Sequence, residues 1–139
     1  MKAVIDTNII IDAIASRVPF NRAAEEILLL AAERKISAAI TARTASDIYY
    51  LAKKYLKNAE QTIIVMKKLF TILDIITVDR TACIRAFDTD MDDYEDSLLA
   101  VCAKQWKADH IITRNKKDFV NSPVPALLPG EYSPLISHY

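Results

Sequence analysis

KAVID, the run from Lys2 to Asp6, decides how the rest of the chain is interpreted. It is a short apolar stretch with β-branched residues, and it ends on the polar sequence Asp6-Thr7-Asn8. Apolar residues then recur at positions 9, 10, 13 and 14, which is helical spacing. The pattern predicts a strand, an acid at its carboxyl end, and a helix.

The same order of strand and helix continues along the chain. Further strands are predicted at Ile36–Ile40, Leu73–Val78, His110–Thr113 and, as an edge strand bracketed by prolines, Val124–Leu128. Helices are predicted at Ala23–Ala31, at Ala42–Leu56, from the cap Asn58 to Phe70, after the cap Asp79 and at Tyr94–Lys107, with a loop at Arg114–Val120. This alternation indicates an α/β fold in a single domain, residues 1–139, with a mostly parallel sheet of four to five strands covered on both faces.

The composition fits one domain without a membrane segment. With 139 residues, 52% of them hydrophobic, the chain can fill a single core. Apolar runs such as Ile27–Ala32 are far shorter than the roughly 20 residues that span a bilayer. Asp6 and Asp12 interrupt the N-terminal apolar run before a signal-peptide core can form, so we expect a cytoplasmic protein. Cys83 and Cys102 are too few for a disulfide framework and fit reduced core residues.

Charge and glycine content limit the classes of function that the chain can have. The 18 basic and 18 acidic side chains give zero net charge, which counts mildly against nucleic acid, although carboxylates around a metal would cancel a basic surface in this total. Gly130 is the single glycine, which excludes the glycine-rich loops that bind phosphates. His110 and His138 are isolated, so we expect them to be structural or solvated and not metal ligands.

Several acids lie after predicted strands or on helices near them. Asp6 ends the first strand, and Asn115 and Asp118 follow the strand that ends in HIITR. In an open parallel sheet, ligands bind at the carboxyl ends of the strands, and Asp47 and Asp96 lie on helices that can reach this edge. Carboxylates that converge there would suit Mg²⁺ or Mn²⁺, which prefer hard oxygen ligands. The sequence permits this convergence but does not require it.

Each of these acids also has an ordinary structural interpretation. Asp6 taken alone fits an N-cap of the first helix equally well, and Asp93 with Asp96 fits a cap and its box partner. Asp47 is compatible with a solvated position on its helix. Asp96 is harder to explain in this way, because its position just before Leu98, Leu99 and Ala100 points it towards buried surface, where a carboxylate needs a partner.

The polar segment after the fourth strand is equally ambiguous. Asn115 and Asp118 fit ordinary turns. The simplest interpretation is that three basic residues are surface charges, and contact with phosphate groups is the second interpretation; these residues are Arg114, Lys116 and Lys117. Taken one at a time, these residues leave both interpretations open.

Four segments taken together resemble the PIN-domain nucleases: VIDTN at residues 4–8, ISAAITARTASDIYY at 36–50, YEDSLLAVCA at 94–103 and IITRNKKDF at 111–119. Each segment alone is a weak signal, whereas four in this order at family-like spacings are a strong one. The chain is similar to the bacterial toxin components of toxin–antitoxin pairs, the VapC-like ribonucleases. The resemblance extends from Lys2 to about Leu128.

The resemblance implies a three-layer α/β/α sandwich, a divalent metal ion (Mg²⁺ or Mn²⁺) and hydrolysis of phosphodiester bonds in RNA. By position, it implies that Asp6, Asp47, Asp96 and Asn115 are the catalytic residues, with Asp6 and Asp96 as metal ligands. Asp47 would orient or deprotonate the attacking water. The chain departs from the family at two of these positions. Asp47 stands where Glu is usual, and Asn115 removes one negative charge, which leaves the number of metal ions open.

The resemblance also implies supporting residues and partners. Hydrogen bonds to the ligands or to water would come from Thr7, Asp93 and Asp118, and contacts to the RNA backbone from Arg114, Lys116 and Lys117. The implied protein partners are an antitoxin and a second copy of the chain. Apolar residues within Ala23–Leu30 and Ile63–Phe70 could form the dimer surface, although core packing is the first use expected of them.

Two other classes of protein also place an acid after the first strand. A PIN-like domain that has lost catalysis would be an RNA- or protein-binding module. Such a domain would be expected to lack one of the acids, whereas Asp6, Asp47 and Asp96 are all present here. An Asp-nucleophile phosphatase needs a second acid two residues on, where this chain has Asn8, and a phospho-acceptor receiver needs paired acids. A metal-dependent ribonuclease is therefore the expected function, and the binding module is the alternative.

Overall fold

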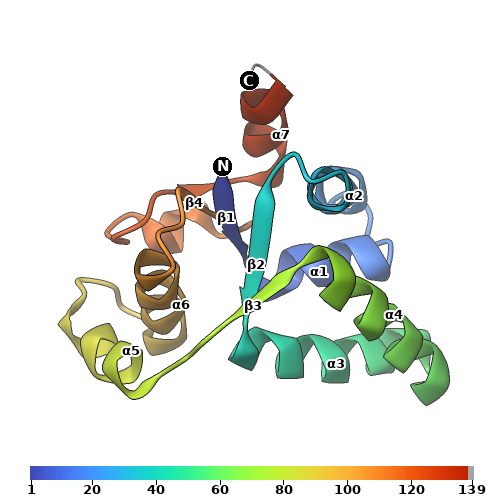
Figure 1. The fold of residues 1–139 in the computed structure, drawn as a ribbon, viewed down its shortest axis with the longest axis horizontal. Helices are drawn as coiled ribbons and strands as arrows, with labels where there is room; N and C mark the ends of the chain where they lie inside the picture. Colours follow the sequence, from blue (N-terminus) through green and yellow to red (C-terminus); the bar gives the residue numbers. More distant parts are fainter. Residues whose placement is uncertain (138–139) are drawn as a thin grey trace.

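The computed structural model describes residues 1–137, which are built around a five-stranded sheet (Figure 1). The strands pair in parallel in the order β3-β2-β1-β4-β5. Their bounds are β1 (Lys2–Ile5), β2 (Ser37–Thr41), β3 (Asp74–Ile76), β4 (His110–Ile112) and β5 (Ala126–Leu127). The predicted parallel sheet is confirmed, and the strand predicted between the prolines is one of its edges.

Alternate residues of the three inner strands point into two separate cores. In β1, Ala3 and Ile5 belong to one core and Val4 to the other, and all three are fully buried. In β4, Ile112 faces the first core and Ile111 the second. Successive strand side chains face opposite sides of a sheet. A strand that is covered on both sides therefore has to be apolar throughout, which explains why KAVI shows no polar alternation.

Helices cover both faces of the sheet and give the predicted three layers. One layer holds α1 (Thr7–Ile14), α2 (Asn21–Ala32), α3 (Ala42–Leu56), α4 (Ala59–Ile72) and α7 (Pro129–Ser137). The other holds α5 (Arg80–Arg85), α6 (Tyr94–Gln105) and the 3₁₀ turns η1 (Ala86–Asp88) and η2 (Lys116–Phe119). Figure 1 shows α5 and α6 on one side of the strands and α1 to α4 on the other.

Polar residues begin two helices as the sequence predicts. Asn58 Oδ1 accepts a hydrogen bond from the Gln61 N–H at 3.0 Å and begins α4. Asp79 Oδ1 accepts from the Ala82 N–H at 2.8 Å and begins α5. Each oxygen partners an N–H that has no acceptor inside its helix, so these helix starts are determined locally.

The C-terminal helix α7 departs from the sequence expectation, which has no element after residue 128. Gly130 and Pro134 both disfavour a helix, and Pro134 lies inside this one. Tyr132 and Ile136 lie four residues apart on one face and are buried in the core that α2 shares. Tertiary packing of an apolar face outweighs the weak local propensity here.

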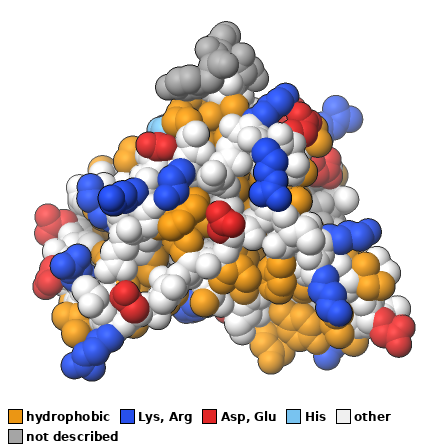
Figure 2. Space-filling view, in the orientation of Figure 1, with side chains coloured by type: hydrophobic (Ala, Val, Ile, Leu, Met, Phe, Trp, Pro, Cys, Tyr) orange, Lys and Arg blue, Asp and Glu red, His pale blue; other side chains and the backbone are white. Residues whose placement is uncertain are grey.

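The apolar stripe of α4 is divided between core and surface. Met66 and Leu69 are buried, as predicted, whereas Ile63, Ile64 and Phe70 are 44%, 48% and 42% exposed. Core packing therefore accounts for only part of this stripe, because its residues spread around more of the helix than one face can bury. Figure 2 shows hydrophobic side chains gathered on the surface where α3 and α4 lie.

Within the described residues, Cys83, Cys102 and His110 belong to no group of three side chains that could bind a metal. Cys102 is buried and Cys83 partly buried, and both are free thiols. His110 opens β4, and its burial lowers its pKa, while His138 lies outside the described residues. Over residues 1–137, no helix is both long enough and apolar enough to cross a membrane.

Candidate active site

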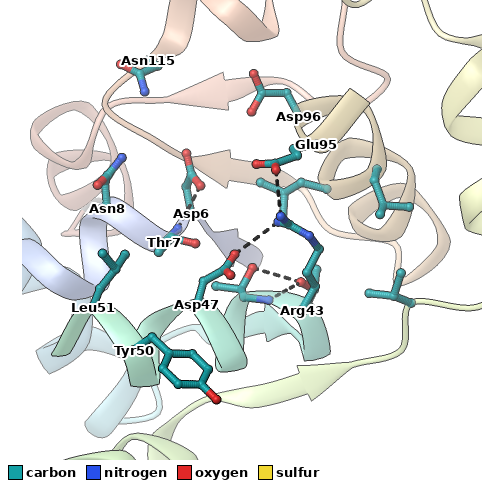
Figure 3. Close-up of a pocket in the computed structure, with 15 residues that line it drawn as sticks. Asp6, Thr7, Asn8, Arg43, Asp47, Tyr50, Leu51, Glu95, Asp96 and Asn115 are labelled. Carbon is teal, nitrogen blue, oxygen red and sulfur yellow. Dashed lines mark hydrogen bonds and ion pairs between the residues drawn. The ribbon is translucent and has the colours of Figure 1, made fainter. Parts of the chain in front are cut away.

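The carboxyl ends of β1 and β2 border a cavity of about 500 Å³ (Figure 3). Its walls come from the residues that follow β1, from α3, from the first turn of α6 and from Asn115 after β4. Four acids line it: Asp6, Asp47, Glu95 and Asp96. The structure thus brings together the three acids predicted from the sequence and adds a fourth, Glu95.

Asp6 is held in place by its neighbours on both sides. Its Oδ1 accepts a hydrogen bond from the Thr7 N–H at 2.8 Å, and its Oδ2 accepts from the hydroxyl of the fully buried Thr113 at 2.9 Å. Burial nevertheless raises the pKa of Asp6, against the effect of these two bonds. Asp6 therefore serves as the N-cap of α1 and also presents a carboxylate to the cavity, so its two interpretations are compatible.

Asp96 lies in the first turn of α6, opposite Asp6. Its N–H donates to Asp93 Oδ2 at 3.0 Å, so Asp93 is the N-cap of this helix and its structural interpretation is confirmed. Burial raises the pKa of Asp96 to about 6, with further contributions from Asp93, Asp6, Asp118 and Glu95. Negative charges that crowd together in this way make a proton or another cation favourable at this carboxylate.

Asp47 enters the cavity from α3 but is already paired. Its Oδ2 lies 3.2 Å from Nη1 of Arg43, one turn earlier on the same helix. Nη2 of Arg43 donates to Glu95 Oε1 at 2.8 Å. Neither Arg43 nor Glu95 was predicted from the sequence as part of the site. The i,i+4 spacing is a signal that could have suggested Arg43, and Glu95 directly precedes Asp96.

The segment after β4 contributes less than the sequence suggests. The exposed Asn115 lines the cavity, and its N–H donates to the Thr113 hydroxyl at 3.1 Å. Asp118 and Lys117 line a neighbouring hollow of about 360 Å³ instead, which they share with Asp96. Lys116 Nζ is paired with Glu131 of α7 at 3.0 Å. Asp118 therefore affects the cavity through its charge and not as part of its lining.

Arg114 belongs to a charged group beside the cavity, which we name the Asp12 cluster and which comprises Asp12, Arg17 and Arg114. Asp12 is fully buried, with Oδ1 2.7 Å from Arg17 Nε and Oδ2 2.9 Å from Arg114 Nε. The Arg17 contact is a hydrogen bond, while the Arg114 contact is an ion pair without hydrogen-bond geometry. Arg17 also donates to Asn8 Oδ1 at 3.1 Å, which connects the cluster to the cavity lining.

The cavity fits a divalent cation in its chemistry. Within residues 1–137, no three acidic, histidine or cysteine side chains are already arranged around one point as metal ligands. Mg²⁺, however, usually takes only one or two carboxylates and completes its shell with water and substrate oxygens. Asp6 and Asp96 supply such carboxylates, and the pKa of Asp96 is raised first by burial and then by neighbouring acids, whose negative charge a cation would neutralise.

The sheet order and the acid-lined cavity at its carboxyl edge define an α/β protein with a candidate cation site. The sequence matches the PIN domain family over residues 2–117, and the chain therefore belongs to this family. This membership supports nuclease activity as the broad class of function. No protein with a curated description matches the sequence.

Solved structures with the same fold include chains of VapBC and toxin–antitoxin complexes. A chain of VapBC2 from Rickettsia felis, solved with a promoter DNA fragment, has a TM-score of 0.69 at 21% identity, covering 92% of this chain and 98% of that one. A chain of a toxin–antitoxin complex from Klebsiella pneumoniae has a TM-score of 0.68 at 26% identity, covering 91% and 97%. VapBC-1 from nontypeable Haemophilus influenzae gives 0.67 at 19% identity, covering 94% and 99%.

Proposed function

We propose that the chain is a ribonuclease that requires Mg²⁺ or Mn²⁺ and hydrolyses phosphodiester bonds in RNA. The observation that carries this proposal is the crowding of carboxylates around Asp96, whose pKa is raised to about 6 at the edge of the sheet where ligands bind. Membership in the PIN domain family supports the same activity. Asp6 and Asp96 are the proposed metal ligands.

The proposed roles follow from where the side chains lie. When bound, the cation would lower the pKa of the attacking water and neutralise charge on the phosphate. Thr113 and the Thr7 N–H hold the two oxygens of Asp6 in a fixed orientation. Asp47 would orient the water or take its proton once it is released from Arg43. Asn115 would bind water or a phosphate oxygen at the opposite wall.

The basic residues proposed to contact RNA differ in whether an acidic side chain already pairs with them. Lys117 is exposed and lines the hollow next to the cavity, and it is the most accessible of them. Lys116 would have to leave Glu131, and Arg114 is held by Asp12. We therefore assign a mobile contact to Lys117 and a fixed positive charge near the cavity to Arg114.

We propose two protein partners: an antitoxin, and a second copy of the chain. The toxin–antitoxin complexes that share this fold support the antitoxin. The exposed apolar residues of α4, Ile63, Ile64 and Phe70, offer one surface for either. Co-expression with the product of the adjacent gene, followed by size-exclusion chromatography, tests both, because a chain that elutes alone as a monomer contradicts them.

We place the protein in the cytoplasm, where RNA and such a partner are available.

Cleavage of RNA by designed variants tests the proposed activity. We expect the parent chain to cut RNA with Mg²⁺ or Mn²⁺ and to stop when EDTA is added. Asp6→Asn and Asp96→Asn should each lose about 100-fold or more in rate, the scale on which groups that stabilise charge in a site contribute. Asn is a good N-cap, so Asp6→Asn retains the start of α1. The measurement is the initial rate of cleavage of a labelled RNA.

The matched control is Asp74→Asn, which changes an exposed acid at the amino end of β3. It should cut as fast as the parent. If Asp6→Asn and Asp96→Asn also cut at the parent rate, the assignment of the site is wrong. A parent chain that cuts no RNA but binds it, or that binds a partner, would favour the alternative of an inactive binding module.

A further inference from the structure

Arg43 is the only basic residue in the lining of the acidic cavity, within the part of the chain that the structure describes. It lies in the first turn of α3, and its guanidinium reaches across to the first turn of α6. One nitrogen lies 3.2 Å from Asp47 Oδ2 and the other 2.8 Å from Glu95 Oε1. Figure 3 shows this guanidinium between the carboxylates of Asp47 and Glu95.

The position of Arg43 is explained by the cavity and not by the helix. A cation in the first turn of a helix meets the positive end of the helix dipole, which is unfavourable. The carboxylates of Asp47 and Glu95 offset this disadvantage. The guanidinium has two donor directions that fit two separate carboxylates, which the ammonium group of a lysine matches less well. Arg43 thus supplies positive charge to a cavity that has an excess of negative charge.

The two ion pairs of Arg43 are easy to exchange. The side chain of Arg43 is 45% exposed, and those of Asp47 and Glu95 are 43% and 66% exposed. Ion pairs at such exposure contribute little to stability, because water competes for both partners. A divalent cation carries twice the charge of a guanidinium and can approach the carboxylates more closely. The contacts of Arg43 are therefore suited to being displaced by such a cation.

We propose that Arg43 is a built-in competitor for the divalent cation, because its guanidinium neutralises the Asp47 and Glu95 carboxylates in the same cavity as the proposed ligands Asp6 and Asp96, and a cation bound there competes for that negative charge. This inference rests on the proposed function, since it concerns the same cavity. It gives Arg43 a positioning role: while paired, it keeps Asp47 turned towards α6.

Binding of Mn²⁺ to the purified chain, measured by isothermal titration calorimetry without RNA, tests the inference. In Arg43→Gln, Mn²⁺ should bind about threefold to tenfold more tightly than in the parent, which is the ratio expected for the loss of two exposed ion pairs. Arg43→Lys should fall between the two, because lysine retains the charge but pairs less well with two carboxylates. The matched control is Arg22→Gln on α2, an exposed position outside the cavity, which should bind as the parent does.

The outcomes separate this inference from the proposed function. If the parent binds Mn²⁺ and Asp6→Asn weakens binding while Arg43→Gln leaves it unchanged or weakens it, the competition is disproved and the metal site stands. If neither the parent nor Arg43→Gln binds Mn²⁺, both proposals fail. Binding by Arg43→Gln alone would support the competition in its strongest form. Circular dichroism of each variant establishes that it is folded.

Discussion

The Asp12 cluster and the acidic cavity lie side by side, and they differ in how the negative charge of their carboxylates is compensated. Asp12 is fully buried, with both oxygens facing arginine nitrogens at 2.7 and 2.9 Å. Asp6 and Asp96 are only partly buried, and neither forms an ion pair with a basic side chain in the described part of the chain. The pKa values of both are raised, largely by burial.

This difference separates a carboxylate that belongs to the fold from one that is available for chemistry. A buried charge is tolerated when residues of opposite charge lie beside it, and Asp12 has two such partners, Arg17 and Arg114. A partly solvated acid that is surrounded by other acids lacks such compensation and gains from an external cation. The same side chain therefore has two roles, and the supply of positive charge around it decides which one applies.

The largest effect is expected at Asp12. Asp12→Ala should lower the free energy of unfolding by about 3 kcal/mol, because Arg17 and Arg114 would then lie beside a buried cavity with no negative charge to pair with. The estimate is at the low end for buried pairs because the side chains of Arg17 and Arg114 are 25% and 27% exposed and can recover some hydration. Urea denaturation at pH 7 measures this difference.

The control for Asp12→Ala is Glu26→Ala, an exposed acid on α2, for which a change within about 0.5 kcal/mol is expected. If both variants lose the same small amount, the Asp12 cluster contributes little to the fold. In that case the contrast between the two regions would not hold.

The sheet could be predicted from the sequence because its inner strands are mainly apolar. Residues 3–5, 38–40 and 111–112 of these strands are buried on both sides, so their composition identified them. Helix α7 escaped prediction because Pro134 and Gly130 outweigh, at the level of sequence, the two apolar residues that dock it. That packing depends on a surface of α2 about 100 residues away, which no local pattern contains.

The acids of the site were predictable from strand ends, and their partners were not. In the sequence, Asp12 is notable only as a break in an apolar run, and its partner Arg114 lies far along the chain. Thr113, which fixes Asp6, is found only when β1 and β4 are known to be neighbours. Long-range pairing of charges depends on topology, so it became visible only in the structure.

A smaller effect, of opposite sign, is expected at Asp96. Its pKa of about 6 lies above the ordinary value of 3.8, so the folded chain holds this proton more tightly than the unfolded chain does. Stability is therefore lost as the pH rises from about 4 to about 6. In metal-free buffer, Asp96→Asn should remove this penalty and stabilise the chain by about 1 kcal/mol at pH 8, with little change at pH 4.

The expected stabilisation by Asp96→Asn is smaller than the pKa shift alone implies, because Asp96 is only partly buried. A shift of this size in a fully buried group would correspond to about 3 kcal/mol, and water in the cavity screens much of that. The measurement is urea denaturation with EDTA at both pH values, with Asp74→Asn as the control. A destabilisation by Asp96→Asn at pH 8 would contradict the view that the cavity lacks positive charge.

The smallest effect is expected at Phe20, whose ring stacks against Arg114 of the Asp12 cluster. The guanidinium carbon of Arg114 lies 4.1 Å from the centre of this ring, and Phe20 is 43% exposed. Phe20→Leu retains apolar cover but removes the cation–π contact, so a loss of about 0.5 kcal/mol is expected. In an Arg114→Gln background the same change should cost nothing further, because no cation remains to stack on the ring. Urea denaturation of the two single variants and the double variant measures the coupling. Equal costs in both backgrounds would mean that Phe20 acts by packing alone, and that the charge of the cluster is balanced without it.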